Sequence, residues 1–174
     1  LRTRGRAGLD LRWTVCPTGG VDKISAFMSL FGGNQLHVAV LLDFASGQKR
    51  RVDELRKSQL LQHGHVLTVD TYSGKAEADI EDVLGDALYV QLVNACYGLK
   101  PKQAAAPPAS VGRIVKQVEE HFRTLPADVD EFDHFRPSSY LLENRLAFLK
   151  KATGVDDALA RFERLFVDLN ALLK

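Results

Sequence analysis

Apolar residues in the first hundred positions alternate between short continuous runs and helical spacing. The continuous runs predict three strands, at residues 11–16 (LRWTVC), 37–43 (HVAVLLD) and 65–70 (HVLTVD). Between and after these runs the apolar residues recur every three or four positions, which predicts helices over 21–31, 49–63 and 77–97. The first part of the chain therefore has the order strand, helix, strand, helix, strand, helix.

This alternation is typical of an α/β fold in which a parallel sheet is flanked by helices. In such folds ligands bind at the carboxyl ends of the strands. Two of the predicted strands end on a carboxylate, Asp43 and Asp70. We therefore expect a functional site at this edge of the sheet.

The alternation stops at a segment rich in Pro and Ala, residues 101–110, which we interpret as a linker. Beyond it, apolar residues at helical spacing predict three helices, over 111–125, 137–153 and 156–174. The predicted organisation is an α/β domain over 1–100, the linker, and a helical domain over 111–174.

Composition fits a folded globular protein, because 45% of the 174 residues are hydrophobic and 26% are charged. The 23 basic and 22 acidic residues leave a net charge of +1, which argues against a protein that binds polyanions by bulk charge alone. The two cysteines, Cys16 and Cys96, show no metal or disulfide spacing and favour a reducing, cytoplasmic setting. We expect no membrane association, since no run approaches the ~20 apolar residues of a membrane span.

Charge is nevertheless segregated along the chain. Residues 49–57 are mainly basic, whereas residues 70–86 contain six carboxylates and a single basic residue, Lys75. Such segregation suits a site where an acidic centre binds cations and basic flanks bind phosphates, and it also suits ordinary solvated helix faces.

The acidic residues concentrate in the stretch GKAEADIEDVLG, residues 74–85, at the expected start of a helix. The helix dipole favours one or two carboxylates there, but it does not account for all four. The four are Glu77, Asp79, Glu81 and Asp82. Clustered carboxylates are commonly sustained by Mg²⁺ or Mn²⁺, which prefer oxygen ligands. With Asp43 they form a candidate site for metal-assisted phosphoryl chemistry, and helical spacing places Asp79 and Asp82 on one face with Glu81 turned aside.

The order of three motifs resembles a known family. GG at 19–20, LLDFASG at 41–47 and GKAEADIEDVL at 74–84 resemble the Toprim catalytic domain of the overcoming-lysogenization-defect (OLD) family nucleases, especially their class 2. The resemblance covers roughly residues 10–100, and the helical tail matches the C-terminal appendage of that family. It implies a Toprim-like, Rossmann-like sheet, two bound Mg²⁺ or Mn²⁺ ions, and endonuclease activity on DNA.

Carried onto this sequence, the resemblance makes Asp43 the first aspartate of the family's Asp-x-Asp motif. Ala45 stands in place of the second aspartate, so Ser46 and Gly47 are expected to supply hydroxyl or backbone contacts. The acidic residues of 77–82 match the family's later acidic segment. The glutamate of the first Toprim strand would lie upstream of Leu1. The resemblance also implies an ABC-type ATPase domain upstream, and a homodimer formed through it.

Basic residues near these motifs are candidates for binding the DNA phosphates. Together with Ser46 they are Lys23, Lys49 and Arg50. The family also uses a lysine from its C-terminal region, and Lys150 or Lys151 is the candidate, with Lys150 expected to stabilise charge at the scissile phosphate. An ordinary solvated helix end explains these two lysines equally well.

Two other functions are compatible with the residues. One is a flavodoxin-like or receiver-like module, in which a strand-end aspartate is the functional carboxylate. The other is a catalytically silent interaction domain, in which Ala45 marks the loss of a metal ligand and the acidic segment is only a helix start. Metal-dependent cleavage of DNA separates the nuclease from both.

Overall fold

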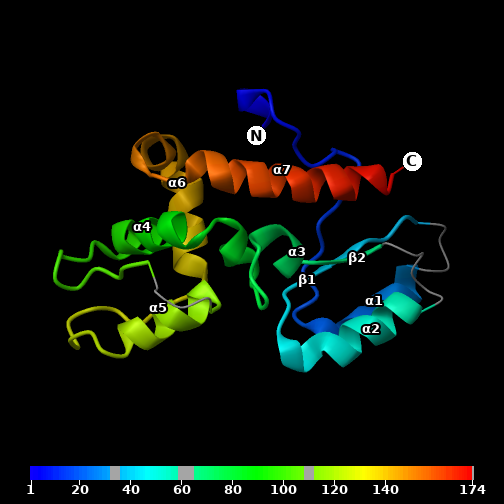
Figure 1. Ribbon diagram of the computed structural model, residues 1–174, viewed down its shortest axis with the longest axis horizontal. Coiled ribbons are helices and arrows are strands. Elements are labelled where there is room, and N and C mark those ends of the chain that lie inside the picture. The colour runs from blue at the N-terminus through cyan, green and yellow to red at the C-terminus, as the bar shows by residue number, and fades with distance from the viewer. Residues whose placement is uncertain (32–35, 59–64, 108–111, 174) are drawn as a thin grey trace.

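The structure is a computed structural model that describes residues 1–31, 36–58, 65–107 and 112–173. It is a mixed α/β fold that is mostly helical (Figure 1). The strands are β1 (Val40–Leu42) and β2 (Val66–Thr68). The α-helices are α1 (Ile24–Phe31), α2 (Lys49–Lys57), α3 (Asp70–Ser73), α4 (Asp86–Tyr97), α5 (Ile114–Phe122), α6 (Phe135–Lys151) and α7 (Val155–Ala171). Short 3-10 helices are η1 (Arg2–Arg4), η2 (Val21–Lys23), η4 (Ser46–Gln48) and η5 (Ile80–Val83).

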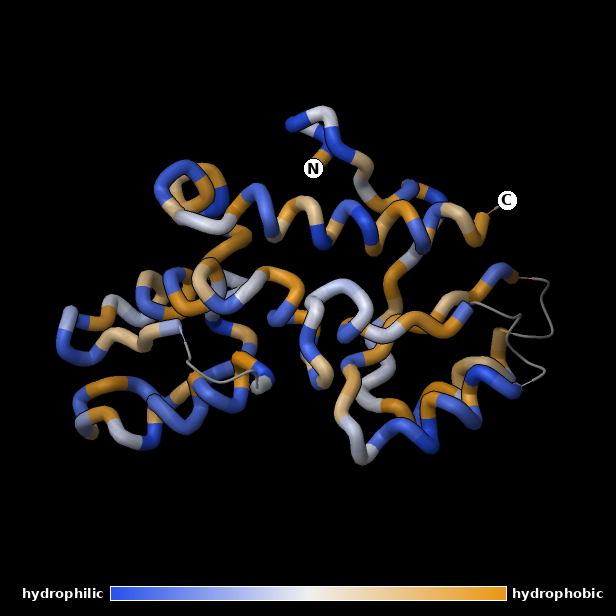
Figure 2. The backbone as a smooth tube through the Cα atoms, viewed as in Figure 1, coloured by the Kyte–Doolittle hydropathy of each residue, from blue (hydrophilic) through white to orange (hydrophobic). Residues whose placement is uncertain are grey.

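The two strands pair in parallel, with Val40 opposite Val66 and Leu42 opposite Thr68. Helix α2 lies between them in the sequence and forms the crossover that a parallel pair requires. Both strands are mainly apolar, as the continuous runs in the sequence predict (Figure 2). The expected α/β character and parallel pairing are therefore confirmed, in a sheet of two strands within the described residues.

Helices cover the small sheet from two directions. On one face, α1 and α2 pack through a core that also includes Val66 (Figure 1). This core consists of Ile24, Met28, Val52, Leu55 and Val66. Helix α7 provides a second core, in which Leu165 packs with Val69, Tyr72, Ala78 and Val83. The apolar residues of α7 thus help to fix the segment that follows β2.

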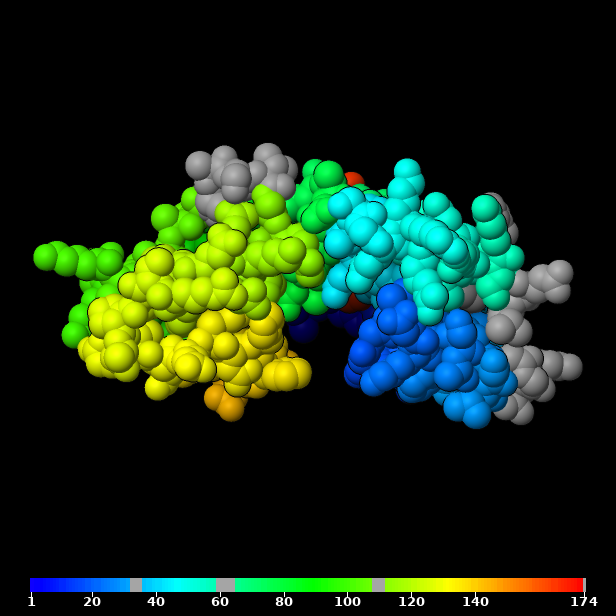
Figure 3. All heavy atoms as spheres, turned by 90° about the horizontal axis from the view of Figure 1, so that it is seen from below, coloured from blue at the N-terminus to red at the C-terminus, as the bar shows by residue number. Residues whose placement is uncertain are grey.

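Helices α4, α5 and α6 form the other half of the molecule. Their core is built from α4 and α5 and includes Tyr89, Ile114 and Phe122. Seen from below, the surface is hollowed between this half and the half that contains α1 and α2 (Figure 3). Helix α7 runs along both halves (Figure 1), and Val155 and Ala158 at its start pack against Leu88 of α4. The division at the 101–110 linker stays a prediction.

The prediction of a strand at residues 11–16 is wrong, because these residues form a turn followed by irregular backbone. The preceding segment binds to α7 instead of to a sheet. The backbone N–H of Ala7 donates to Glu163 Oε1 at 2.7 Å, and that of Asp10 donates to Asn170 Oδ1 at 2.8 Å. Side chains of a helix therefore satisfy backbone groups that a neighbouring strand would otherwise satisfy.

The helix expected over 77–97 begins later than its apolar pattern indicates. Residues 76–79 are not helical, and the regular helix α4 starts only at Asp86, after the short η5. Gly85 separates η5 from α4 with a φ of 85°, a conformation that L-residues with a side chain rarely adopt. The acidic stretch therefore lies on an extended segment and a single turn, and not along a helix.

The other predicted helices are present, but their ends differ from the predicted ones. Helix α2 ends at Lys57, and the rest of the helix predicted over 49–63 falls largely on residues 59–64, outside the described residues. The three helices predicted after the linker correspond to α5, α6 and α7. Among the described residues, no helix combines the length and apolarity needed to cross a membrane.

Candidate functional site

The site is built where the chain after β1 meets the chain after β2. Residues 43–46 and 77–80 run antiparallel, and Phe44 and Ala78 exchange two backbone hydrogen bonds, each 2.8 Å long. Ala78 is completely buried, so there is no room for a larger side chain at this position. This pairing carries the acidic residues of 77–82 to the carboxyl end of β1.

Asp43 directly contacts the acidic segment. Its Oδ1 accepts a hydrogen bond from the backbone N–H of Ile80 at 2.9 Å. Desolvation by the surrounding protein raises the pKa of Asp43, the charge of Asp79 raises it further, and the Ile80 bond only partly offsets both. The surroundings of Asp43, at the end of β1, therefore stabilise its charged form less well than water does.

Glu81 is half-buried beside the same two carboxylates. Burial raises the pKa of Glu81, and the charges of Asp43 and Asp79 add to the increase. We call Asp43, Asp79 and Glu81 the three-carboxylate site. Like charges held together in partly dry surroundings attract a cation, so this group is the best candidate for function among the described residues.

A cation from the protein itself already contacts this site. Arg113, the residue before α5, donates from Nε to Oδ2 of Asp79 at 2.8 Å, and its second nitrogen donates to Oδ1. Asp79 is 5% exposed, so the ion pair is largely removed from water. The hydrogen bond to Asp79 and the charges of Asp43 and Glu77 raise the pKa of Arg113.

Asp82, a predicted metal ligand, has a structural role in this conformation. Its Oδ2 accepts from the backbone N–H of Asp79 at 2.8 Å, and its Oδ1 accepts from the N–H of Ile114 at 3.0 Å. Lys75 also lies 2.7 Å from Oδ1. Asp82 is only 1% exposed, and these bonds to both of its oxygens compensate for the burial of its charge.

Glu77, another predicted ligand, is engaged with Ser46. Its Oε1 accepts from the backbone N–H of Ser46 at 2.9 Å and also from the Ser46 hydroxyl. The Ser46 hydroxyl and N–H lower the pKa of Glu77, since they stabilise its charged form. The pair fastens the antiparallel contact, and it removes Ser46 from the groups that are free to bind phosphate in this conformation.

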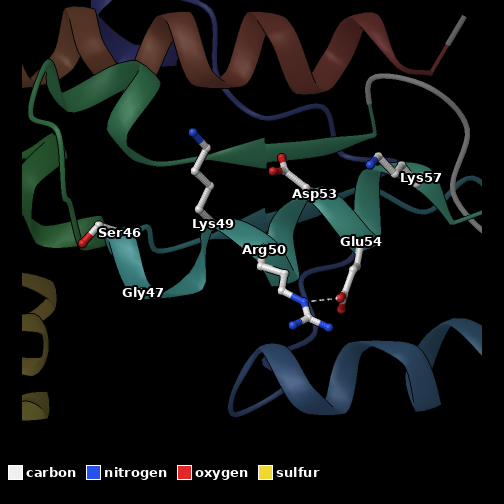
Figure 4. A pocket seen from close by; sticks show the side chains of 7 residues that line it. All are labelled: Ser46, Gly47, Lys49, Arg50, Asp53, Glu54 and Lys57. Carbon is white, nitrogen blue, oxygen red and sulfur yellow. Dashed lines mark hydrogen bonds and ion pairs between the residues drawn. The ribbon is translucent and has the colours of Figure 1, made fainter.

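The predicted phosphate-binding residues of α2 lie beside an open groove of about 600 Å³. Figure 4 shows Lys49 and Asp53 on one side of α2, with Arg50 and Glu54 on another side and paired at 3.0 Å. The groove is lined by Ser46, Gly47, Lys49, Arg50, Asp53, Glu54 and Lys57. The carboxylates of Asp53 and Glu54 lie among the three basic side chains of this lining, so the groove is less basic than the sequence of α2 indicates.

Lys23 ends η2, and its neighbour Asp22 forms a 2.8 Å ion pair with Arg51 of α2, which places η2 close to the groove. Lys150 lies in the last turn of α6. His134, at the other end of this helix, lies 2.9 Å from Glu119 Oε1 of α5. The expected role of Lys150 at the scissile phosphate stays a prediction.

Sequence reasoning missed three residues around the site: Lys75, Tyr89 and Arg113. Tyr89 is 2% exposed, and its buried hydroxyl lacks a hydrogen-bond partner within the described structure. Burial raises the pKa of Tyr89, with the charge of Glu81 as the next cause. Lys75 stood out in the sequence as the lone basic residue of an acidic stretch, but Arg113 lies in no motif.

The donor chemistry of the three-carboxylate site fits a hard divalent cation, because carboxylate oxygens are the ligands that Mg²⁺ prefers. Over the described ranges, however, no three His, Cys, Asp or Glu side chains are close enough to hold a metal ion together. Arg113 holds the Asp79 oxygens in this conformation.

Comparison of the chain with protein-family models, with curated proteins and with solved structures gives no match.

Proposed function

We propose that this chain is the catalytic part of a divalent-metal-dependent DNA endonuclease, with a Toprim-like fold. The observation that carries the proposal is the contact between Asp43 and Ile80, which joins a strand-end carboxylate to the segment bearing Asp79 and Glu81. The antiparallel pairing of Phe44 with Ala78 holds this contact in place. The resemblance of residues 10–100 to the OLD nucleases supplies the expectation that the substrate is DNA.

Asp43 and Glu81 are the residues that would hold Mg²⁺ or Mn²⁺, with Asp79 as a third donor when it is free of Arg113. The ion would supply a bound water of lowered pKa and a positive charge beside the phosphate. The raised pKa values of Asp43 and Glu81 reflect carboxylates whose charge is not yet balanced, and a cation would balance it. Asp82 and Glu77 position the acidic segment.

The basic residues on either side of the site would contact the DNA backbone. Lys49 and Arg50 lie on α2, and Lys116 of α5 acts on the charge of Glu77 from the other direction. Contacts of this kind bind phosphates without reading sequence. By the family resemblance the full protein would add an upstream ATPase and a homodimer contact.

The test is cleavage of supercoiled plasmid in Mg²⁺, Mn²⁺ or EDTA. Asp43→Ala and Glu81→Ala should abolish metal-dependent nicking, while Glu143→Gln, which removes a carboxylate from the exposed side of α6, should leave it unchanged. Circular dichroism and thermal unfolding of each variant separate loss of the site from loss of the fold. Cleavage that survives both alanine variants, or that resists EDTA, would assign the activity elsewhere.

The same assay with the chain extended towards its N-terminus covers the glutamate that the resemblance places before Leu1. If neither version cuts DNA with any divalent metal, the silent interaction domain becomes the better assignment. Two observations favour that second function: Ala45 stands where the resemblance expects a metal-binding aspartate, and Arg113 already neutralises Asp79.

A further inference from the structure

Helix α6 has apolar residues on two opposite faces. Leu141 and Phe148 pack against the core that α4 and α5 form. On the opposite face, Leu142 and Leu146 are 73% and 81% exposed, and Phe135, two turns before Leu142, is 77% exposed. A surface helix normally has polar residues on the side away from the core. An exposed apolar stripe of this kind is typical of a surface that binds another molecule.

Two exposed charged residues border this stripe, Glu143 and Lys150. Ion pairs within a helix join residues three or four positions apart. None of the residues three or four positions from Glu143 or from Lys150 is charged. The face therefore presents one negative and one positive charge, about 10 Å apart along the helix and without an oppositely charged neighbour on α6.

The residues of this face are arranged symmetrically about Leu146. Each residue of an α-helix turns by about 100° and advances by about 1.5 Å. Leu142 and the half-buried Leu149 therefore lie on one side of Leu146, about 6 Å before it and about 4.5 Å after it. Glu143 and Lys150 lie on its other side, about 4.5 Å before it and about 6 Å after it.

We propose that two copies of the chain pair through α6, with the helices antiparallel and Leu146 at the two-fold axis. An axis perpendicular to both helices reverses the helix direction, and each side of α6 then faces the same side of its copy. Leu142 lies opposite Leu149 of the second copy, and Glu143 lies opposite Lys150 of the second copy, each pair level to within about 1.5 Å along the helices. Symmetry repeats both contacts, so this face of α6 complements itself.

Charge matching distinguishes this arrangement from a parallel one. In a parallel pair the side with Leu142 and Leu149 would face the side with Glu143 and Lys150, and both charges would lie against leucine. One pair of helices buries less than the roughly 1,200–2,000 Å² of a stable interface, so the dimer is reversible and forms at high protein concentration. The contact is independent of nuclease activity, because it uses no residue of the three-carboxylate site.

The test is sedimentation velocity of the 174-residue chain over a roughly 100-fold range of protein concentration, across which we expect a shift from monomer to dimer. Leu146→Glu brings two carboxylates together at the axis and should keep the chain monomeric throughout. Leu11→Glu adds the same charge at another exposed leucine and should dimerise like the wild type. A wild-type chain that stays monomeric would assign the apolar face to a different molecule and overturn the proposal, as would a dimer that survives Leu146→Glu.

Charge reversal tests which residues face each other. Glu143→Lys and Lys150→Glu each replace two attractive pairs per dimer with two repulsive ones, and each should raise the Kd of the dimer by about 10-fold. The double variant again has opposite charges in both pairs and should return the Kd to within about threefold of wild type. Both residues are exposed, so these variants keep the buried contacts of α6. A double variant as weak as the single ones contradicts the pairing of Glu143 with Lys150.

Disulfide formation distinguishes antiparallel from parallel helices. In a chain whose Cys16 and Cys96 are replaced by alanine, Leu146→Cys places two thiols at the axis and should form a linked dimer on oxidation with copper phenanthroline. Leu142→Cys is the matched control, because its two copies would lie about 12 Å apart along the helices, beyond the reach of a disulfide. Equal cross-linking of both variants would indicate a parallel pair and refute the proposed geometry.

Discussion

Lys75 and Asp82 form an ion pair of 2.7 Å in which the Asp82 side chain is fully enclosed and the Lys75 side chain is 11% exposed. Lys75 Nζ also contacts Asp86 Oδ1 at 2.5 Å and the Gly112 carbonyl at 2.8 Å. Burial alone would lower the pKa of Lys75, but the hydrogen bonds to Asp82 and Asp86 outweigh it and raise this pKa. One lysine thus joins the acidic segment, the start of α4 and the approach to α5.

Replacing Lys75 with Met should lower the free energy of unfolding by about 3 to 5 kcal/mol, because Asp82 would remain buried without its cation. Urea denaturation followed by circular dichroism measures the change. Lys102→Met, at an exposed position, is the control and should change stability by less than about 0.5 kcal/mol. A similar small loss in both variants would mean that Asp82 is adequately solvated without Lys75.

Glu81→Gln should alter how stability depends on pH. Because burial and the charges of Asp43 and Asp79 raise the folded-state pKa of Glu81 above its unfolded value, the folded protein binds the proton more tightly. Wild-type stability should therefore fall as pH rises through that folded-state pKa, and recover as pH is lowered. The Gln variant lacks this titrating group, so its stability should fall less steeply as pH rises. Unfolding curves in EDTA, measured upward from below the ordinary pKa of a glutamate (about 4.3), make the comparison, and parallel profiles would refute it.

Gly85 and Gly74 offer a matched pair of substitutions. Both have positive φ, 85° and 78°, so alanine should cost roughly 1 to 2 kcal/mol of backbone strain at either position. A Cβ on Gly85 would also collide with the guanidinium of Arg161, whereas one on Gly74 would meet nothing within 4 Å.

Arg161 donates to the carbonyls of Val83 and Leu84 at 2.8 Å each, and the collision would disturb both bonds. Gly85→Ala should therefore lower the free energy of unfolding by about 1 to 3 kcal/mol more than Gly74→Ala. Thermal unfolding of the two variants ranks them, and equal losses would show that the Arg161 side chain moves aside freely.

The hydroxyl of Tyr72 donates to Asp168 Oδ2 at 2.9 Å and joins α3 to α7. Tyr72→Phe keeps the ring, which is 4% exposed, but leaves a carboxylate without this donor. The free energy of unfolding should fall by about 1.5 kcal/mol, the usual contribution of a hydrogen bond to a charged group. Asp168→Asn retains an acceptor oxygen and should lose less; a larger loss in Asp168→Asn would contradict this account.

Local patterns in the sequence were sufficient to predict the two parallel strands and most helices. The apolar runs that end at Asp43 and Asp70 correspond to β1 and β2, as continuous apolar runs predict. The burial that such runs also predict holds for β2, whereas Leu41 of β1 is exposed. The expected strand at 11–16 is wrong for a reason outside that segment, since the chain just before it binds the side chains of α7. Contacts between distant segments are not visible in a local pattern.

The candidate site, too, was predictable from the sequence only in part. The acidic segment and Asp43 were recognisable by composition, and the structure joins them through Ile80. The roles of the individual carboxylates were not recognisable, because they depend on partners far along the chain. Asp79 pairs with Arg113, 34 residues away, and Glu77 with Ser46, 31 residues away. The prediction that Asp79 and Asp82 share one face assumed a helix at 77–82. The backbone there is instead extended, because Ala78 pairs with Phe44.

The packing of Leu165 against Ala78 and Val83 has a consequence for synthesis of the protein on the ribosome. Translation proceeds from the N-terminus, so the residues that bear Asp43, Asp79 and Glu81 emerge well before α7 does. Until Leu165 emerges, the core beneath these residues lacks one of its members. The nascent chain can thus form its local helices early, but the segment that bears Asp79 and Glu81 completes its packing only after α7 has been made.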